Sequence, residues 1–335
     1  MNTSHTHPVS APFRVLLYYK YVPIWDYESF AVEHLEFCKQ LGLLGRIVVA
    51  EEGINGTVSG TVEQTEAYIR ELRTDSRFED MWFKIDEVHE HTFDKMHVRA
   101  KQEIVTWRFD DDIDPTRTTG AYLTPEEFYA AMQQDDVLII DGRNDYEYDL
   151  GHFQGAIRPH VKNSREFPEW IRENLANFKD KKVLTYCTGG IRCEKLSGFL
   201  IKEGFTDVSQ LHGGIVTYAK DSTVRGQGFE GDCYVFDKRI SVPVNQVNPT
   251  VVSSCYYCNT VTARYRNCGH KGCHTQFFLC ENCEEEHKRS CSPKCEAAPK
   301  HRHDWYLERG WAQREETEEE TEQAEQIEQA EYIEL

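Results

Sequence analysis

Val183-Leu184-Thr185-Tyr186 is an apolar, strand-like run, and Cys187-Thr188-Gly189-Gly190-Ile191-Arg192 follows it directly and leads into the helix-like run 194–200. A cysteine between a strand and a helix lets backbone N–H groups curl around its sulfur at the positive end of a helix dipole. Because these donors stabilise a thiolate, Cys187 is predicted to be a nucleophile with a lowered pKa. Arg192 adds a positive charge that can hold an anionic adduct on that sulfur.

A buried structural cysteine is the alternative, but it needs neither the glycine pair nor the arginine. We therefore expect the Cys187 sulfur to be ionised, cradled by main-chain amides and within reach of a large polyanionic substrate. A sulfur closed off from solvent would favour a scaffold instead. Cys193 either resolves an oxidised Cys187 as a disulfide or has a packing role.

The residues upstream of this loop add a second pattern. An apolar strand ends at Asp141, Arg143 and a Glu147-Tyr148 pair follow, and Gly151-His152-Phe153-Gln154-Gly155-Ala156 comes next. With the Cys187 loop, this pattern resembles the rhodanese (sulfurtransferase) homology domain over residues 122–222. The resemblance implies a parallel-sheet α/β domain with Cys187 and Arg192 as catalytic residues, and a six-residue loop suited to sulfur rather than phosphate. Asp141 and Arg143 are expected to form a structural pair, and His152 to be a scaffold residue.

The region 13–108 alternates strand and helix signals. Strands are expected at 14–19, 46–50, 57–59 and 82–85, with helices at 27–42 and 61–73, and Asn55-Gly56 is predicted to be a hairpin turn. The order βαββαβ predicts a ferredoxin-like α+β domain, with an antiparallel sheet and two helices on one face.

Three stretches carry a closer resemblance: residues 46–60, residues 101–106 and the loop from Cys187 to Lys195. They resemble the bacterial tRNA uridine(34) hydroxylase family, over about residues 13–295. The resemblance implies an oxidoreductase that modifies tRNA, with molecular oxygen as co-substrate and an anticodon loop as partner. The product would be 5-hydroxyuridine at position 34. Cys187 would either add to C6 of the pyrimidine or carry a persulfide that takes part in oxygen activation.

Two other functions stay open at the level of sequence. A rhodanese-type sulfurtransferase would carry a persulfide on Cys187 and pass its sulfur to an acceptor. An inactive rhodanese fold used as an interaction module is the third possibility, although it has no need of Cys187 and Arg192.

The C-terminal part contains eight cysteines within 41 residues. Paired Cys-x-x-Cys elements at this density predict two structural zinc ions, because sites made only of thiolates leave no open coordination position. The pairing is either sequential or crossed. Replacement of one cysteine ligand by His270 or His274 also stays open. Basic and aromatic residues in this region suit either an RNA-binding surface or an ordinary solvated surface. The predicted ligands are Cys255, Cys258, Cys268, Cys273, Cys280, Cys283, Cys291 and Cys295.

The 335-residue chain has a formal net charge of −19, which by itself counts against a nucleic-acid partner. However, residues 315–335 hold ten glutamates and no basic residue, so much of this charge lies in one tail. No run is long enough to span a bilayer and the N-terminus has no apolar leader, so a cytoplasmic protein is expected. In that reducing compartment the 12 cysteines suit metal binding and catalysis better than disulfides.

The expected organisation has six parts, and the oligomeric state stays open. The motif Gly226-Gln227-Gly228-Phe229-Glu230-Gly231 precedes a strand rather than a helix, so no NAD or flavin site is expected. The parts are a disordered N-terminus (1–12), the ferredoxin-like domain (13–108), the rhodanese domain (122–222), an extended linker (223–254), a zinc-binding module (255–305) and an acidic tail (311–335).

Overall fold

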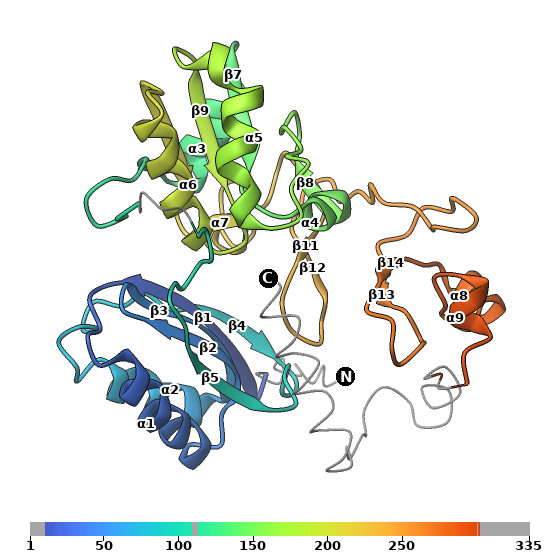
Figure 1. Ribbon diagram of the computed structural model, residues 1–335, viewed down its shortest axis with the longest axis horizontal. Helices are drawn as coiled ribbons and strands as arrows, with labels where there is room; N and C mark the ends of the chain where they lie inside the picture. The colour runs from blue at the N-terminus through green and yellow to red at the C-terminus, as the bar shows by residue number, and fades with distance from the viewer. Residues whose placement is uncertain (1–10, 109–112, 300, 302–335) are drawn as a thin grey trace, which may run out of the picture. The chain divides into compact units, whose positions relative to one another are not determined.

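The computed structural model describes residues 11–108, 113–299 and 301 (Figure 1). The chain divides into two units, 1–253 and 254–335, which are described separately. The acidic tail lies wholly outside the described residues, as does most of the predicted disordered N-terminus. Among the described residues, every helix is too short or too polar to cross a membrane.

The N-terminal domain is a five-stranded sheet with two helices on one face (Figure 1). The strand order is β4-β1-β3-β2-β5, and all neighbours are antiparallel except β2 and β5. This confirms the predicted ferredoxin-like architecture and adds β5, which the sequence analysis missed. The elements are β1 (Phe13–Tyr21), α1 (Tyr27–Gln40), β2 (Leu44–Ala50), β3 (Gly53–Thr61), α2 (Val62–Leu72), β4 (Lys84–Val88) and β5 (Met96–Ala100).

The predicted hairpin turn at Asn55-Gly56 is wrong. The chain turns at residues 51–52, and both Asn55 and Gly56 lie inside β3, where Gly56 pairs with Tyr18 of β1. A Cβ atom at Gly56 would lie 2.4 Å from the Tyr18 hydroxyl oxygen. Glycine therefore serves close packing against Tyr18 rather than a turn.

The central domain contains a parallel four-stranded sheet, as predicted, with the order β6-β10-β9-β7. Because β9 is a central strand, between β7 and β10, the residues that follow it lie at the middle of the carboxyl-terminal edge of the sheet. The elements are β6 (Ala121–Leu123), α3 (Pro125–Met132), β7 (Val137–Asp141), α4 (Asp145–Leu150), β8 (Gly151–Phe153), α5 (Phe167–Asn174), β9 (Lys182–Tyr186), α6 (Ile191–Lys202), β10 (Asp207–Leu211) and α7 (Gly214–Tyr218), with short 3₁₀ turns at Ser164–Glu166 and Ala176–Phe178.

Residues 223–254 are not the predicted extended linker. They contain β11 (Phe229–Tyr234) and β12 (Ser241–Pro243), and β11 pairs with both β12 and β8 of the central domain. Phe229 and Cys233 are fully buried in the same core as Phe128 and Tyr186. The period-two burial of Phe229, Gly231 and Cys233 explains why this stretch forms a packed strand.

The second unit is small and built around its cysteines. It contains β13 (Tyr265–Asn267), β14 (Gln276–Phe278), α8 (Glu281–Glu286) and α9 (Pro293–Glu296). Its described core consists largely of cysteines with Phe277 and Leu279. So small an apolar core requires another source of stability, such as bound metal.

Candidate active site and metal centres

The Cys187 loop joins β9 to α6 at the carboxyl edge of the parallel sheet. The Gly190 N–H donates a hydrogen bond to the Cys187 sulfur over 3.1 Å, and Gly190 has a positive φ of 104°. A Cβ atom at Gly190 would also lie 2.9 Å from the Tyr19 hydroxyl oxygen. Glycine is therefore required here both by the backbone conformation and by the close approach of Tyr19.

The loop lowers the pKa of the Cys187 thiol to about 6. Burial acts to raise this pKa, but a hydrogen bond from Cys193, the charge of Arg192 and main-chain N–H groups outweigh it. Burial holds the pKa of Cys193 well above its usual value, so Cys193 stays protonated as the donor. The surroundings of the loop thus favour the ionised sulfur expected from the sequence, with Cys193 as an unforeseen hydrogen-bond partner.

Arg192 is held by a carboxylate rather than left free above the sulfur. Its Nη1 and Nη2 lie 2.6 Å and 2.9 Å from the two oxygens of Glu147, and Nη2 also donates to Thr188 Oγ1. Burial acts to raise the pKa of the fully buried Glu147, but Arg192 brings it below the usual value. The sequence showed Glu147 only as part of a motif and gave no sign of this partnership.

The predicted structural pair of Asp141 and Arg143 is confirmed. Arg143 Nη2 lies 2.6 Å from Asp141 Oδ2, both side chains are fully buried, and the Tyr186 hydroxyl donates to the same carboxylate. His152 stacks on Tyr148 and contacts the Tyr148 carbonyl, as expected of a scaffold residue. These groups fix the end of β7 next to the Cys187 loop. Their contacts give them structural roles.

The expectation that a substrate can reach Cys187 directly is wrong for this structure, because the residue has 0% exposure. Burial alone would favour a scaffold, but a scaffold cysteine needs neither the lowered pKa of this thiol nor the hydrogen bond from the Gly190 N–H. Side chains of β1 cover its loop: Leu17 lies against Gly189, and Tyr19 lies against Gly190. The sequence predicted the N-terminal domain as a separate domain, and no pattern in it indicated that this domain covers the Cys187 sulfur.

The start of α6 also binds the N-terminal domain. The Tyr19 hydroxyl donates to Glu194 over 2.8 Å, and Lys195 Nζ lies 2.8 Å from Glu52 and 2.9 Å from Glu103. Glu194 and Lys195 closely follow the Cys187 loop in sequence. The start of α6 therefore both shapes this loop and binds the N-terminal domain that covers it.

A cavity of about 410 Å³ lies elsewhere in the first unit. Its lining includes Asp86, which forms ion pairs with both Lys220 and Arg239, and it contains neither Cys187 nor Arg192. We therefore assign the reactive site from the chemistry of the loop and not from this cavity.

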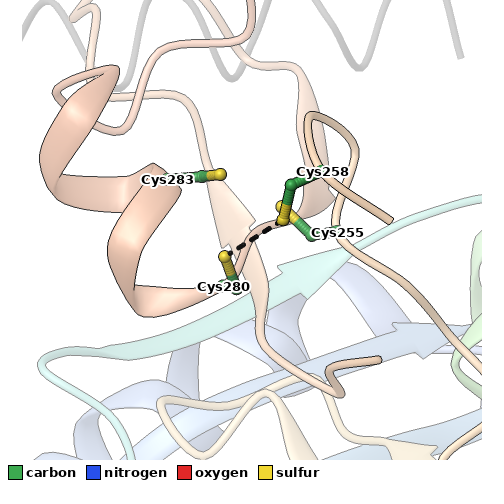
Figure 2. Close-up of side chains that lie close together, drawn as sticks. All are labelled: Cys255, Cys258, Cys280 and Cys283. Atoms are coloured by element: carbon green, nitrogen blue, oxygen red, sulfur yellow. Dashed lines mark hydrogen bonds between the residues drawn. The ribbon is translucent and has the colours of Figure 1, made fainter. Parts of the chain in front are cut away.

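The eight C-terminal cysteines form two groups of four in the crossed arrangement (Figure 2). Cys280 and Cys283 come from the start of α8 and point toward Cys255 and Cys258 on the facing loop. The second group contains Cys268, Cys273, Cys291 and Cys295. The crossed pairing decides between the alternatives left open by the sequence, and neither group includes His270 or His274.

Both groups fit a tetrahedral ion. Sulfur–sulfur distances are 3.6 Å for Cys258–Cys280 and for Cys273–Cys291, and 3.7 Å for Cys291–Cys295. Four thiolates at 2.3 Å from one ion would lie about 3.8 Å apart, whereas a disulfide needs about 2 Å. The donor set and its spacing therefore suit metal binding, and all eight predicted ligand positions lie in the two groups.

The described arginines of the second unit lie next to acidic residues within it. Arg264 binds Glu281 and Glu284, and the buried Arg289 lies 3.5 Å from Glu284. Of the aromatic residues, Tyr265 and Phe277 are buried, whereas Tyr256 is 63% exposed. Among the described residues, the buried side chains serve the fold of the module; Lys300 and Arg302 lie outside them.

The parallel sheet, the six-residue cysteine loop and the two four-cysteine groups define a rhodanese-like α/β protein with an added cysteine-rich module that could bind metal. Family models agree: the chain matches the UPF0176 acylphosphatase like domain over 13–104, the Rhodanese-like domain over 124–221 and the Rhodanase C-terminal model over 230–296. A rhodanese-like domain protein from Staphylococcus aureus is similar to 30% of this chain and 94% of its own, with 21% identity and a TM-score of 0.25.

Relatives match nearly the whole chain. The tRNA uridine(34) hydroxylase of Bacillus licheniformis is 58% identical over 92% of this chain and 94% of its own. The tRNA uridine(34) hydroxylase of Bacillus mycoides is 56% identical over 87% of this chain and 92% of its own. The chain belongs to the tRNA uridine(34) hydroxylase family.

Proposed function

We propose that this protein is a cytoplasmic enzyme that hydroxylates uridine 34 of tRNA at C5, in an oxygen-dependent reaction, and that Cys187 is the reacting group. Identity of 58% to a named hydroxylase over almost the full chain supports the reaction class. The observation that carries the role of Cys187 is its pKa of about 6, set within a loop whose Gly190 N–H donates to the sulfur. A thiol with this pKa is mostly ionised at neutral pH.

The thiolate supports two routes. In the first, the sulfur adds to C6 of uracil, the electron pair of the C5–C6 double bond moves toward C5 and O4, and C5 then attacks an oxygen donor. Loss of the C5 proton and release of Cys187 restore the double bond. In the second, a persulfide on Cys187 takes part in oxygen activation. In both, one oxygen atom of O₂ enters the product and the other leaves as water, with two electrons from an external two-electron reductant and two protons from solvent.

Arg192 supports this chemistry through its charge. It lowers the pKa of Cys187, and its ion pair with Glu147 keeps it beside the loop. The substrate is an exposed base of an anticodon loop, which can be presented without melting a duplex. Because Leu17 and Tyr19 cover the loop, uridine reaches Cys187 only when these side chains move.

We propose zinc as the metal of both four-cysteine groups. All-thiolate tetrahedral sites select zinc or iron–sulfur clusters, and a closed four-thiolate site leaves no position for substrate. The ions would therefore hold the fold of the C-terminal module.

Nucleoside mass spectrometry tests the reaction. tRNA from a strain lacking the gene, carrying wild type, Cys187→Ala or Cys187→Ser, is compared after growth with and without oxygen. We expect 5-hydroxyuridine only with the wild-type gene and oxygen, and oxygen-18 gas should label the product. Retention of 5-hydroxyuridine in the Cys187→Ala strain would refute the role of Cys187. A sulfur-bearing product in place of an oxygenated one would instead establish a sulfurtransferase.

A further inference from the structure

Six side chains from two domains form a closed ring of contacts beside the Cys187 loop, which we call the six-residue ring. Three come from the N-terminal domain and three from the central domain. Neither the ionised cysteine nor the arginine belongs to it, and the reaction chemistry described above does not use it. Its members are Tyr19, Trp82, Lys84, Tyr122, Glu194 and His212.

The first half of the ring is built from aromatic faces. Lys84 Nζ lies 4.9 Å from the centroid of the Tyr19 ring and 4.6 Å from that of Trp82. Trp82 stacks on His212 with centroids 4.8 Å apart and an angle of 28° between the ring planes. The edge-on contact of His212 with Tyr122, at 5.3 Å, continues the ring within the central domain.

A buried carboxylate closes the ring. The Tyr122 hydroxyl donates to Glu194 over 2.9 Å, and the Tyr19 hydroxyl donates to it over 2.8 Å. Tyr19 also lies against Gly190 of the reactive loop. The ring therefore adjoins the site of chemistry, and Glu194 fixes the orientation of both tyrosines.

Lys84 is the unusual member. The residue is only 8% exposed, its ammonium lies against the Tyr19 and Trp82 rings, and no hydrogen bond or ion pair to it is present among the described residues. Aromatic faces satisfy a cation only in part, so the three N–H donors of this ammonium are available to an oxygen of a ligand.

The outer rim is aromatic and open. Trp82 is 42% exposed and Tyr122 is 51% exposed, so large apolar rings face solvent next to the buried ammonium. Proteins that bind unpaired RNA use this combination, in which bases stack on aromatic rings and cations bind the oxygens.

We propose that the six-residue ring is a nucleotide-binding subsite of the tRNA substrate: an unpaired base stacks on the Trp82–Tyr122 rim, and Lys84 donates to an oxygen of that nucleotide. This inference rests on the proposed function for its choice of RNA. The subsite binds the loop nucleotide next to the one that reacts. It binds this nucleotide before Tyr19 moves away from the Cys187 loop.

Binding of a fluorescently labelled anticodon stem-loop by the full-length protein tests the subsite. The matched pair is Tyr122→Ala and Tyr122→Phe, because both lose the hydroxyl bound to Glu194 and only the first loses the ring. We expect the dissociation constant to rise about 5- to 100-fold for Tyr122→Ala and Trp82→Ala, as for the loss of one stacked base, and to change less than about twofold for Tyr122→Phe. Equal affinity of Tyr122→Ala, Trp82→Ala and wild type would overturn the subsite.

Lys84→Met distinguishes the two sources of the acceptor oxygen. If the oxygen belongs to a phosphate, the slope of log affinity against log salt becomes shallower by about one unit. If it belongs to a base, affinity falls with the slope unchanged. Unchanged affinity at every salt concentration would remove Lys84 from the subsite.

A second measurement needs no variant, so it stands even if substitutions disturb folding. Stem-loops carrying 5-iodouridine at each loop position are irradiated with the wild-type protein, and cross-linked peptides are identified by mass spectrometry. We expect cross-links to Trp82 or Tyr122, and their absence from both residues at every position would overturn the proposal. Retention of 5-hydroxyuridine in the Cys187→Ala strain, together with intact cross-links, would refute the role of Cys187 and leave the RNA subsite standing.

Discussion

Arg192 and Glu147 form a two-pronged ion pair in which Nη1–Oε2 is 2.6 Å and Nη2–Oε1 is 2.9 Å, and Glu147 is fully buried. The pair joins α4 to the loop that carries Cys187. Because Glu147 neutralises Arg192, it limits the positive charge that reaches the sulfur. The pair thus contributes to the shape of the loop and to the pKa of its thiol.

Substitutions of the two partners are expected to lower the free energy of unfolding by similar amounts and to shift the pKa of Cys187 in opposite directions. Glu147→Gln and Arg192→Met should each lower the free energy of unfolding by about 3 kcal/mol, because each leaves one buried charge unpaired. Glu147→Gln should lower the pKa of Cys187 further, since Arg192 is no longer neutralised, and Arg192→Met should raise it. The pH dependence of iodoacetamide labelling of the Cys187 peptide, read by mass spectrometry, gives the pKa. Shifts in the same direction for both variants would contradict this account.

The stability of the first unit should depend on pH through Cys187. The folded-state pKa of about 6 lies below the unfolded value of 9.0, so the unfolded chain binds more protons between these values. The contribution is complete above pH 9 and is lost as pH falls through 6. Wild type should therefore gain stability over Cys187→Ser as pH rises from 6 to 8, by at most about 1.4 kcal/mol per pH unit. Urea unfolding of both proteins at each pH provides the measurement, and parallel curves would show an un-ionised thiol.

Metal content should follow the crossed pairing of cysteines. Cys255→Ser with Cys283→Ser removes two ligands of one group, so one of two ions per chain should remain. Cys255→Ser with Cys268→Ser disrupts both groups and should remove both ions. Sequential pairing would give the reverse result in elemental analysis. Cys38→Ala serves as the control, because this buried cysteine lies in the N-terminal core outside either group.

The sequence predicted the parts whose signals are local. The apolar run before Cys187 and the glycines after it each act within a few residues, and the structure confirms the strand and the loop. The dense cysteine pattern likewise identified the eight cysteines that form the two groups of four.

Long-range contacts were not predictable from one sequence. Asn55-Gly56 carries a strong turn signal, yet its glycine is explained by Tyr18, far away along the chain. Lys84 was visible only as part of a strand, and its position between Tyr19 and Trp82 depends on the folded sheet. The burial of Cys187 likewise depends on how β1 meets α6, which no local pattern encodes.

Lys195 should control access to Cys187. It is 1% exposed and its ammonium bridges Glu52 and Glu103, so Lys195→Met leaves two carboxylates together without their cation. Losing a buried ion-pair partner costs about 3–5 kcal/mol, and repulsion between the carboxylates opposes the contact of the N-terminal domain with α6. Because Leu17 and Tyr19 of that domain cover the loop, Lys195→Met should label at Cys187 at least about tenfold faster than wild type.

The control for this prediction is Lys182→Met, which removes a single, partly exposed ion pair with Asp207. Exposed pairs contribute about 0–1 kcal/mol, so the labelling of Cys187 should stay within a few-fold of wild type. Hydrogen exchange in β1 separates local opening from global unfolding: Lys195→Met should lose protection in β1 before the core strands β7 and β9 do. Labelling of Lys195→Met at the wild-type rate would show that the Tyr19–Glu194 hydrogen bond and apolar packing suffice to hold the cover in place.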